Sequence, residues 1–188
     1  MLEATNGFET TNKPALGGKR LIGAGLLLTL LLQLAVLGTE YLGSIWPLKY
    51  GQPVLLKTEP IDPRSLFRGN YVRLNYSISS VDGDLAAQPF RRHEVVYVAL
   101  KPEGRYHVAD ALLHEPPEQG PFIRGRVRWA GSEIYRIDYG IEAFFMPKRK
   151  ALAAQQAVRE KEAWAQVYLL DSGKAAIADL LCEGGCGE

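Results

Sequence analysis

The longest hydrophobic run of the chain covers residues 21–39 and contains no charged side chain. A helix needs about 20 apolar residues to cross a bilayer, so this run predicts one membrane span. Lys19 and Arg20 come directly before it, whereas Glu40 follows it and the next basic residue is Lys49. Basic residues gather on the cytoplasmic side of membrane helices. The pattern therefore predicts a cytoplasmic N-terminus and places the chain beyond the helix outside the cytoplasm.

A cleaved signal peptide is the alternative interpretation of the same run. However, the run exceeds the usual apolar core of about 7–15 residues, and no pair of small residues suited to cleavage follows it. Tyr41 and Trp46 instead suit an aromatic belt at the outer surface of a bilayer. We therefore favour an uncleaved signal anchor. Gln33, Gly23 and Gly25 within the anchor are compatible with packing against another membrane helix, although a lipid-facing helix also tolerates them.

Beyond the anchor, short alternating or apolar runs are separated by turn residues, which is typical of a mainly β domain. The predicted strands cover residues 54–58, 70–79, 94–101, 105–113, 122–130, 132–145, 165–170 and 175–181. Consecutive hairpins favour an antiparallel sheet of barrel-like or sandwich form. Residues 148–164 are rich in strong helix formers and follow Pro147, so they predict one surface helix.

These elements divide the chain into four parts. Residues 1–18 are polar and aperiodic, which predicts a disordered cytoplasmic tail. Residues 19–46 form the anchor and its interfacial belt, residues 47–184 form the β domain, and residues 185–188 form a short tail. The domain is large enough to bury a core without a metal ion or several disulfides.

The charge and motif content excludes several classes of function. A net charge of +1 gives no basic field that would attract nucleic acid. Neither a G-x-G-x-x-G turn nor a Walker loop is present, so no nucleotide cofactor is expected. The histidines are His93, His107 and His114, and their spacing suits no metal site. We therefore expect neither a cofactor nor a metal ion.

The two cysteines lie close together at the end of the chain. Cys182 and Cys186 enclose a Glu-Gly-Gly sequence whose glycines allow the chain to fold back. In an oxidising compartment, a small disulfide loop is favoured, with two idle thiols as the alternative. Either interpretation is preferred to a metal site, because two thiolates alone do not complete one.

Residues 59–76 form the most distinctive segment of the sequence. Asp62-Pro63 favours a turn, and Gly69 permits a backbone conformation that other residues resist. The chain then enters the alternating strand predicted over residues 70–79. Arg64 and Arg68 are suited to binding an anion, but an ion pair with Asp62 that locks the loop is the simpler interpretation.

This segment resembles the GDYXXLXY family of membrane-anchored bacterial proteins. The residues that carry the resemblance are Asp62, Pro63, Arg64, Arg68, Gly69, Tyr71, Leu74 and Tyr76. Residues 139–147 (YGIEAFFMP) and the closing hairpin around residues 173–177 are similar to the same family, and the resemblance covers residues 51–184. It implies a domain that works in an assembly with a multi-pass membrane protein, and it implies no assigned reaction.

One position departs from the family motif, because Asn70 stands where the motif has aspartate. An amide does not titrate, so this side chain cannot act as an acid, a base or a metal-binding carboxylate. Asparagine serves almost as well as aspartate where the side chain only hydrogen-bonds neighbouring backbone. The substitution therefore favours a structural role for the motif.

A membrane-anchored serine–lysine peptidase similar to type I signal peptidases is the alternative enzymatic interpretation. Residues 68–72 resemble the strand entry of those enzymes, and such a dyad needs a serine beside a desolvated lysine. The candidates are Lys57 with Ser44 or Ser65, and none has the expected sequence setting. We therefore expect a protein without catalytic residues.

The preferred interpretation is an accessory or interaction subunit of a membrane protein complex in the bacterial inner membrane, with its β domain in the periplasm. Arg124, Arg126 and Arg128 alternate along one predicted strand and so share its polar face. Such a row is usually solvated surface, but it is also suited to aligning the acidic surface of a partner protein.

Overall fold

The computed structural model describes residues 16–60, 71–145, 157–158, 160 and 163–182. Its first element is the helix α1 (Leu16–Tyr50), within which Leu21–Tyr50 is long and apolar enough to cross a membrane. Contacts divide the chain into two compact units, Met1–Leu42 and Gly43–Glu188, and α1 belongs partly to each. The expected apolar helix is therefore present, and the second unit contains the β domain.

The helix is longer at its C-terminal end than the sequence predicted, because it continues through Pro47 to Tyr50. Proline lacks only its own N–H group, while the Pro47 carbonyl still accepts a hydrogen bond from the Gly51 N–H at 2.8 Å. A Cβ atom on Gly51 would clash with that carbonyl oxygen. Gly51, rather than Pro47, therefore marks the end of the helix and the turn into the sheet.

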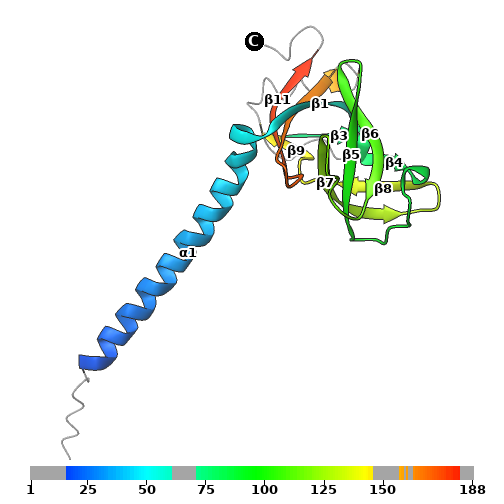
Figure 1. Cartoon of the computed structure of the whole chain (residues 1–188). Coiled ribbons are helices and arrows are strands. Elements are labelled where there is room, and N and C mark those ends of the chain that lie inside the picture. Colours follow the sequence, from blue (N-terminus) through cyan, green and yellow to red (C-terminus); the bar gives the residue numbers. More distant parts are fainter. Residues whose placement is uncertain (1–15, 61–70, 146–156, 159, 161–162, 183–188) are drawn as a thin grey trace, which may run out of the picture. The chain divides into compact units, whose positions relative to one another are not determined.

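Nine strands form one mixed sheet, and two short strands form a separate ladder (Figure 1). The strands of the sheet are β1 (Gln52–Glu59), β3 (Asn75–Tyr76), β4 (Ser80–Asp82), β5 (Val95–Glu103), β6 (Tyr106–Leu113), β7 (Phe122–Ala130), β8 (Ile134–Asp138), β10 (Ala163–Leu169) and β11 (Ala175–Cys182). The ladder pairs β2 (Tyr71–Arg73) with β9 (Ala143–Phe145). Two 3₁₀ turns, η2 (Ser77–Ser79) and η3 (Gly83–Leu85), flank β4.

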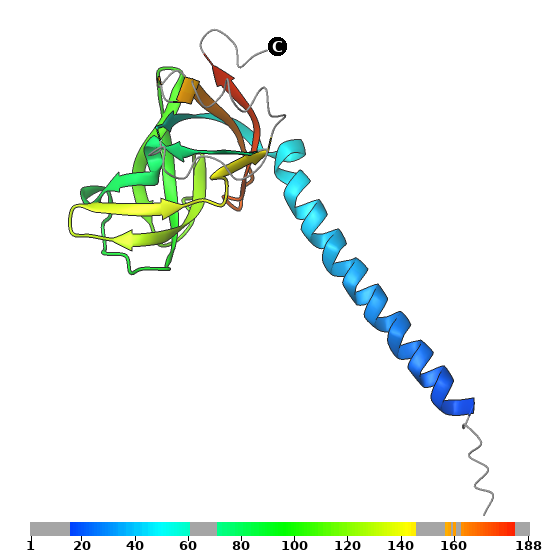
Figure 2. The same cartoon turned by 180° about the vertical axis from the view of Figure 1, so that it is seen from behind.

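The strand order is β11-β10-β1-β6-β5-β7-β8-β4, with β3 also paired to β1. The sheet is therefore mainly antiparallel, as predicted, and it is not closed into a barrel. One pairing differs from the antiparallel prediction, because β1 runs parallel to β6. Figure 2 shows the same arrangement from behind, with β7 and β8 beside each other as a long hairpin.

Three predicted elements have different boundaries in the structure. The single strand predicted over residues 70–79 is divided into β2, β3 and the turn η2, and the strand predicted over residues 132–145 is divided into β8 and β9. The second division occurs at Gly140, whose φ of 81° bends the backbone away from the sheet. Ala163 and Trp164 belong to β10 and not to the predicted surface helix. Residues 157–158 are helical, and most of that predicted helix lies outside the described residues.

The core consists of alternate side chains from the central strands. Leu56 of β1, Val98 of β5, Ile123 of β7 and Val167 of β10 are completely buried, and Tyr76 joins them from β3. Thr58 is equally buried, and its hydroxyl donates a hydrogen bond to the Ala163 carbonyl at 2.7 Å. Because alternate residues of a strand face opposite sides, Asn75 of β3 and Arg128 of β7 point away from the core, and both line the site described next.

Candidate functional site

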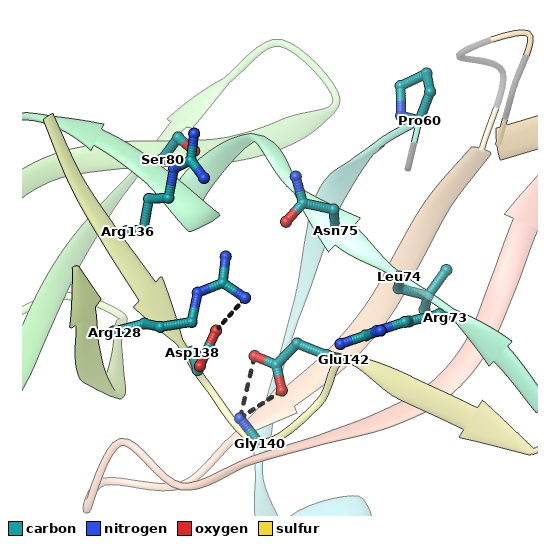
Figure 3. A pocket seen from close by; sticks show the side chains of 10 residues that line it. All are labelled: Pro60, Arg73, Leu74, Asn75, Ser80, Arg128, Arg136, Asp138, Gly140 and Glu142. Carbon is teal, nitrogen blue, oxygen red and sulfur yellow. Dashed lines mark hydrogen bonds and ion pairs between the residues drawn. The ribbon is translucent and has the colours of Figure 1, made fainter. Parts of the chain in front are cut away.

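A polar cleft of about 670 Å³ lies where β2, β3, β4 and the β7–β8 hairpin approach one another (Figure 3). Its lining residues are Pro60, Arg73, Leu74, Asn75, Ser80, Arg128, Arg136, Asp138, Gly140 and Glu142. Arg73 and Asn75 project from the motif segment, whereas Arg128, Arg136 and Asp138 project from β7 and β8. The cleft therefore combines side chains from distant parts of the sequence.

Two buried tyrosines hold the two halves of this site together. The Tyr76 hydroxyl donates a hydrogen bond to the Ile141 carbonyl, and the Tyr139 hydroxyl donates one to the Ile78 carbonyl, each at 2.5 Å. Tyr76 ends the motif segment and Tyr139 begins the later run YGIE, so the two bonds connect these segments reciprocally. We call this pair of bonds the tyrosine clamp.

The environment of the clamp keeps both phenols neutral. Burial raises the pKa of Tyr76 and of Tyr139 well above the usual value, and the nearby negative charge of Glu142 raises both further. A neutral phenol remains a hydrogen-bond donor, so both bonds persist throughout the physiological pH range. The clamp is thus a fixed structural connection.

Backbone hydrogen bonds extend this connection on both sides of the clamp. The Leu74 N–H donates to the Glu142 carbonyl at 2.8 Å, and the β2–β9 ladder continues beyond it. The Glu142 carboxylate accepts hydrogen bonds from the backbone N–H groups of Tyr139 and Gly140. Glu142 therefore secures the turn at Gly140, which fixes one wall of the cleft.

The charges of the cleft are unequally matched. Arg128 forms an ion pair with Asp138 at 3.5 Å, and the Glu142 carboxylate accepts a hydrogen bond from the Gly140 N–H in the turn. Among the described residues, neither Arg73 nor Arg136 forms an ion pair. The arrangement is suited to binding negatively charged groups.

A second hollow of about 520 Å³ continues from the cleft across the face of β7. It shares Asp138 and Gly140 with the cleft and adds Arg124, Arg126 and Lys174. Exposed and buried positions of β7 alternate from Ile123 to Arg128, so Arg124, Arg126 and Arg128 are all exposed as the sequence predicted, and the pairing with β8 is irregular around Arg128. We call these three residues the arginine row. The Arg126 guanidinium donates to the His93 carbonyl at 2.8 Å, which holds the middle of the row against the neighbouring loop.

The structure describes three of the predicted motif residues, Tyr71, Leu74 and Tyr76. Leu74 and Tyr76 are buried in the core, and Tyr71 pairs through its backbone with Phe145. The remaining motif residues, Asp62, Pro63, Arg64, Arg68, Gly69 and Asn70, lie outside the described residues.

The structure describes all three predicted packing residues of the anchor but only one of the two cysteines. Gly23 and Gly25 lie in α1, where a Cβ atom on either residue would meet no other atom within 4 Å, and Gln33 is exposed on the same helix. Cys182 ends β11 and is disulfide-bonded, while Cys186 lies outside the described residues. A loop between the two cysteines therefore stays a prediction.

The serine–lysine interpretation has two of its candidate residues, Lys57 and Ser44, in the described part of the chain. Lys57 lines a hollow of about 450 Å³ together with Ser77, but the Lys57 ammonium lies 5.5 Å from the centre of the Tyr106 ring. The Ser77 hydroxyl is buried without a hydrogen-bond partner in the described structure, so no dyad joins the two. Ser44 lies in α1, and Ser65 is outside the described residues. No group of three or more metal-binding side chains occurs within the described residues either.

Sequence reasoning did not identify the cleft. Arg73 lies between two motif residues, Asn75 and Ser80 are uncharged polar residues, and Arg136 shares a short strand with Asp138. Alternation placed Arg73 on an outward face, but no sequence signal indicated that this face meets β8. The cleft depends on the non-local contacts made by the clamp.

Both segments that meet at the clamp lie within a part of the chain that matches a known protein family. The family model described as GDYXXLXY protein matches residues 33–180. The chain is a member of the GDYXXLXY family. This membership and the apolar helix α1 fit a membrane-anchored protein. No curated protein and no solved structure matches the GDYXXLXY chain.

Proposed function

We propose that this GDYXXLXY protein is a single-pass subunit of a membrane protein complex, with its β domain outside the cytoplasm. The observation that carries the proposal is the arginine row, which lies exposed on β7 and is backed by the tyrosine clamp. A row of cations on a rigid strand presents charges at fixed spacing to an acidic partner surface. The protein acts by binding, and it needs no catalytic residue.

Two features support the orientation in the membrane. Lys19 and Arg20 precede the apolar run on its N-terminal side, which favours a cytoplasmic N-terminus. Cys182 is disulfide-bonded, and disulfides persist in oxidising compartments such as the periplasm. Together these features support a bacterial inner-membrane protein with a periplasmic domain.

The orientation gives a direct expectation for fusion proteins. An alkaline phosphatase fused after Glu188 should be active, whereas a fluorescent protein that folds only in the cytoplasm should be dark at the same position. Intact-mass measurement should show that the mature chain retains its N-terminus at Met1 or Leu2. A mature chain that begins near Tyr41 would instead establish cleavage of a signal peptide.

The anchor is the second proposed contact with the complex. Gln33 carries a polar side chain within the apolar run, and Gly23 and Gly25 leave room for close approach of another helix. An interhelical hydrogen bond in a membrane is worth on the order of 1 kcal/mol, which is enough to bias association. In this proposal the anchor holds the protein next to its partner in the membrane, and the arginine row aligns the β domain on the partner's acidic surface.

Co-purification in mild detergent tests the proposed subunit role. We expect Arg124→Glu combined with Arg126→Glu to reduce the recovery of membrane partners at least tenfold, because the charge reversal repels an acidic surface. Gln33→Leu should reduce recovery more modestly. Lys101→Glu is the matched control, since Lys101 is an exposed cation on β5 whose ion pair with Asp110 is also exposed.

The proposal fails if the parent protein purifies alone at native abundance. It also fails if Lys101→Glu reduces recovery as strongly as the double variant. Circular dichroism and melting temperature should be unchanged in all three variants, because each replaced side chain is exposed.

A further inference from the structure

Three arginines and two carboxylates line the cleft, so its side chains carry a formal surplus of one positive charge. Its two carboxylates already have partners, since Asp138 pairs with Arg128 and Glu142 accepts hydrogen bonds from the turn at Gly140. Arg73 and Arg136 remain without an ion pair among the described residues. Guanidinium groups match the planar geometry of carboxylate and phosphate oxygens, often through two parallel hydrogen bonds.

Neutral donors accompany these arginines. Ser80 lies opposite Arg136 in the β4–β8 register, and Figure 3 shows the two side chains together at one end of the cleft. Asn75 points into the cleft between that end and Arg73. Within the described structure, neither the side-chain amide of Asn75 nor the Ser80 hydroxyl forms a hydrogen bond. The cleft therefore offers hydrogen-bond donors that have not been used by the fold.

The cleft is also preformed and has the dimensions of a ligand site. Its volume of about 670 Å³ lies within the range of roughly 300–1,000 Å³ that is usual for small-molecule pockets. The tyrosine clamp and the Leu74–Glu142 backbone bond hold its two walls together. A preformed site loses little conformational entropy when it binds a ligand.

We propose that this cleft binds a small organic anion carrying carboxylate or phosphate groups, with Arg73 and Arg136 as its principal ligands. Asn75 and Ser80 donate hydrogen bonds to the same ligand. Arg128 contributes less, because its charge is shared with Asp138. Arg128 belongs both to this cleft and to the arginine row, but Arg73 and Arg136 lie outside the row, so neither proposal depends on the other.

Titration calorimetry on the full-length protein in mild detergent tests the site. The probes are succinate, citrate and inorganic phosphate, each compared with sodium chloride at equal ionic strength. We expect at least one probe to bind with a sub-millimolar dissociation constant. Arg73→Gln and Arg136→Gln should each weaken that binding at least tenfold, because each removes a charged donor. Arg91→Gln, which removes an exposed arginine outside the cleft and outside the arginine row, should leave the constant unchanged.

A membrane arm identifies the source of the anion. The calorimetry is repeated in nanodiscs of phosphatidylcholine with or without phosphatidylglycerol. If the soluble probe binds more weakly in the anionic discs, and this difference between the discs disappears in Arg136→Gln, a lipid headgroup is identified as the ligand. Equal binding in both discs would identify a free solute.

The proposal is overturned if none of the three probes binds better than chloride. It is also overturned if Arg73→Gln and Arg136→Gln bind as the parent does, or if Arg91→Gln weakens binding equally. All three arginines are exposed, so these variants should retain the parental melting temperature, which is measured in parallel.

Discussion

Replacing both Tyr76 and Tyr139 with phenylalanine is expected to lower the free energy of unfolding by about 2–5 kcal/mol at pH 7. Each substitution removes one buried hydrogen bond and leaves a backbone carbonyl, of Ile141 or Ile78, without its donor. A buried polar group left without a partner costs about 1–3 kcal/mol. The phenylalanine rings preserve the packing, so the loss reports on the hydrogen bonds alone. Urea unfolding followed by tryptophan fluorescence in mild detergent measures it.

The same variant should change the alkaline limit of stability. The pKa values of Tyr76 and Tyr139 are raised in the folded protein, so above a pH of about 10 the unfolded chain releases these protons and the folded chain retains them. The unfolded state then binds fewer protons, and the free energy of unfolding falls as pH rises. This contribution is complete below the ordinary tyrosine pKa and is lost on the way up to the raised one.

We therefore expect the stability difference between parent and double variant to shrink as pH rises above about 10. Tyr168→Phe on β10 is the control, because Tyr168 is only half-buried and is not part of the clamp. A difference that stays constant between pH 8 and pH 11, or a double variant as stable as Tyr168→Phe, would show that the clamp contributes nothing.

Gly125→Val is expected to destabilise the domain by about 3 kcal/mol. A Cβ atom at Gly125 would clash with the Ile137 side chain and would lie 2.9 Å from the Tyr139 ring. Both neighbours are buried, so they cannot move aside without disturbing the core and the clamp. Overpacking of this kind typically costs about 1–3 kcal/mol, and displacement of Tyr139 adds to that cost.

Ala143→Val is the matched control for this substitution. Ala143 is exposed on β9, so added methyl groups there meet solvent, and the change should stay within about 0.5 kcal/mol. Urea unfolding at pH 7 compares the two variants with the parent. If Gly125→Val unfolds at the parental urea concentration, the close packing of β7 on β8 at this position is refuted.

The local part of this fold could be predicted from the sequence. The apolar run of α1 and the alternation along β7 are strong signals. The length of the run indicates a long apolar helix, and a period of two residues indicates a strand with one buried face. The hairpin turn at Gly104, with φ of 62°, is equally clear from a glycine between two strands. The predicted anchor ended at residue 46, whereas α1 continues through Pro47 to Tyr50 and ends at the turn at Gly51.

The non-local part could not be predicted. Nothing in residues 52–59 indicates that β1 pairs with β10 on one side and with β6 on the other. The cleft has the same origin, because Arg73 and Arg136 line it from segments far apart in the sequence, and Tyr76 and Tyr139 connect these segments. Periodicity reports which face of a strand is buried, but it does not identify the strand that packs opposite.

The central place of β1 has a consequence for how the domain is made. It is the first strand after α1 and pairs with β3 and β6, yet its longest pairing is with β10, the second-last strand of the sheet along the chain. In a domain exported behind its anchor, β1 emerges first, and its pairing with β10 cannot form until almost the whole chain has been translocated. The β5–β6 and β7–β8 hairpins can form during that interval, whereas the β1–β10 pairing has a large sequence separation and so folds slowly. With the proposed topology, periplasmic chaperones and proteases therefore encounter an open β1 edge in every newly made copy.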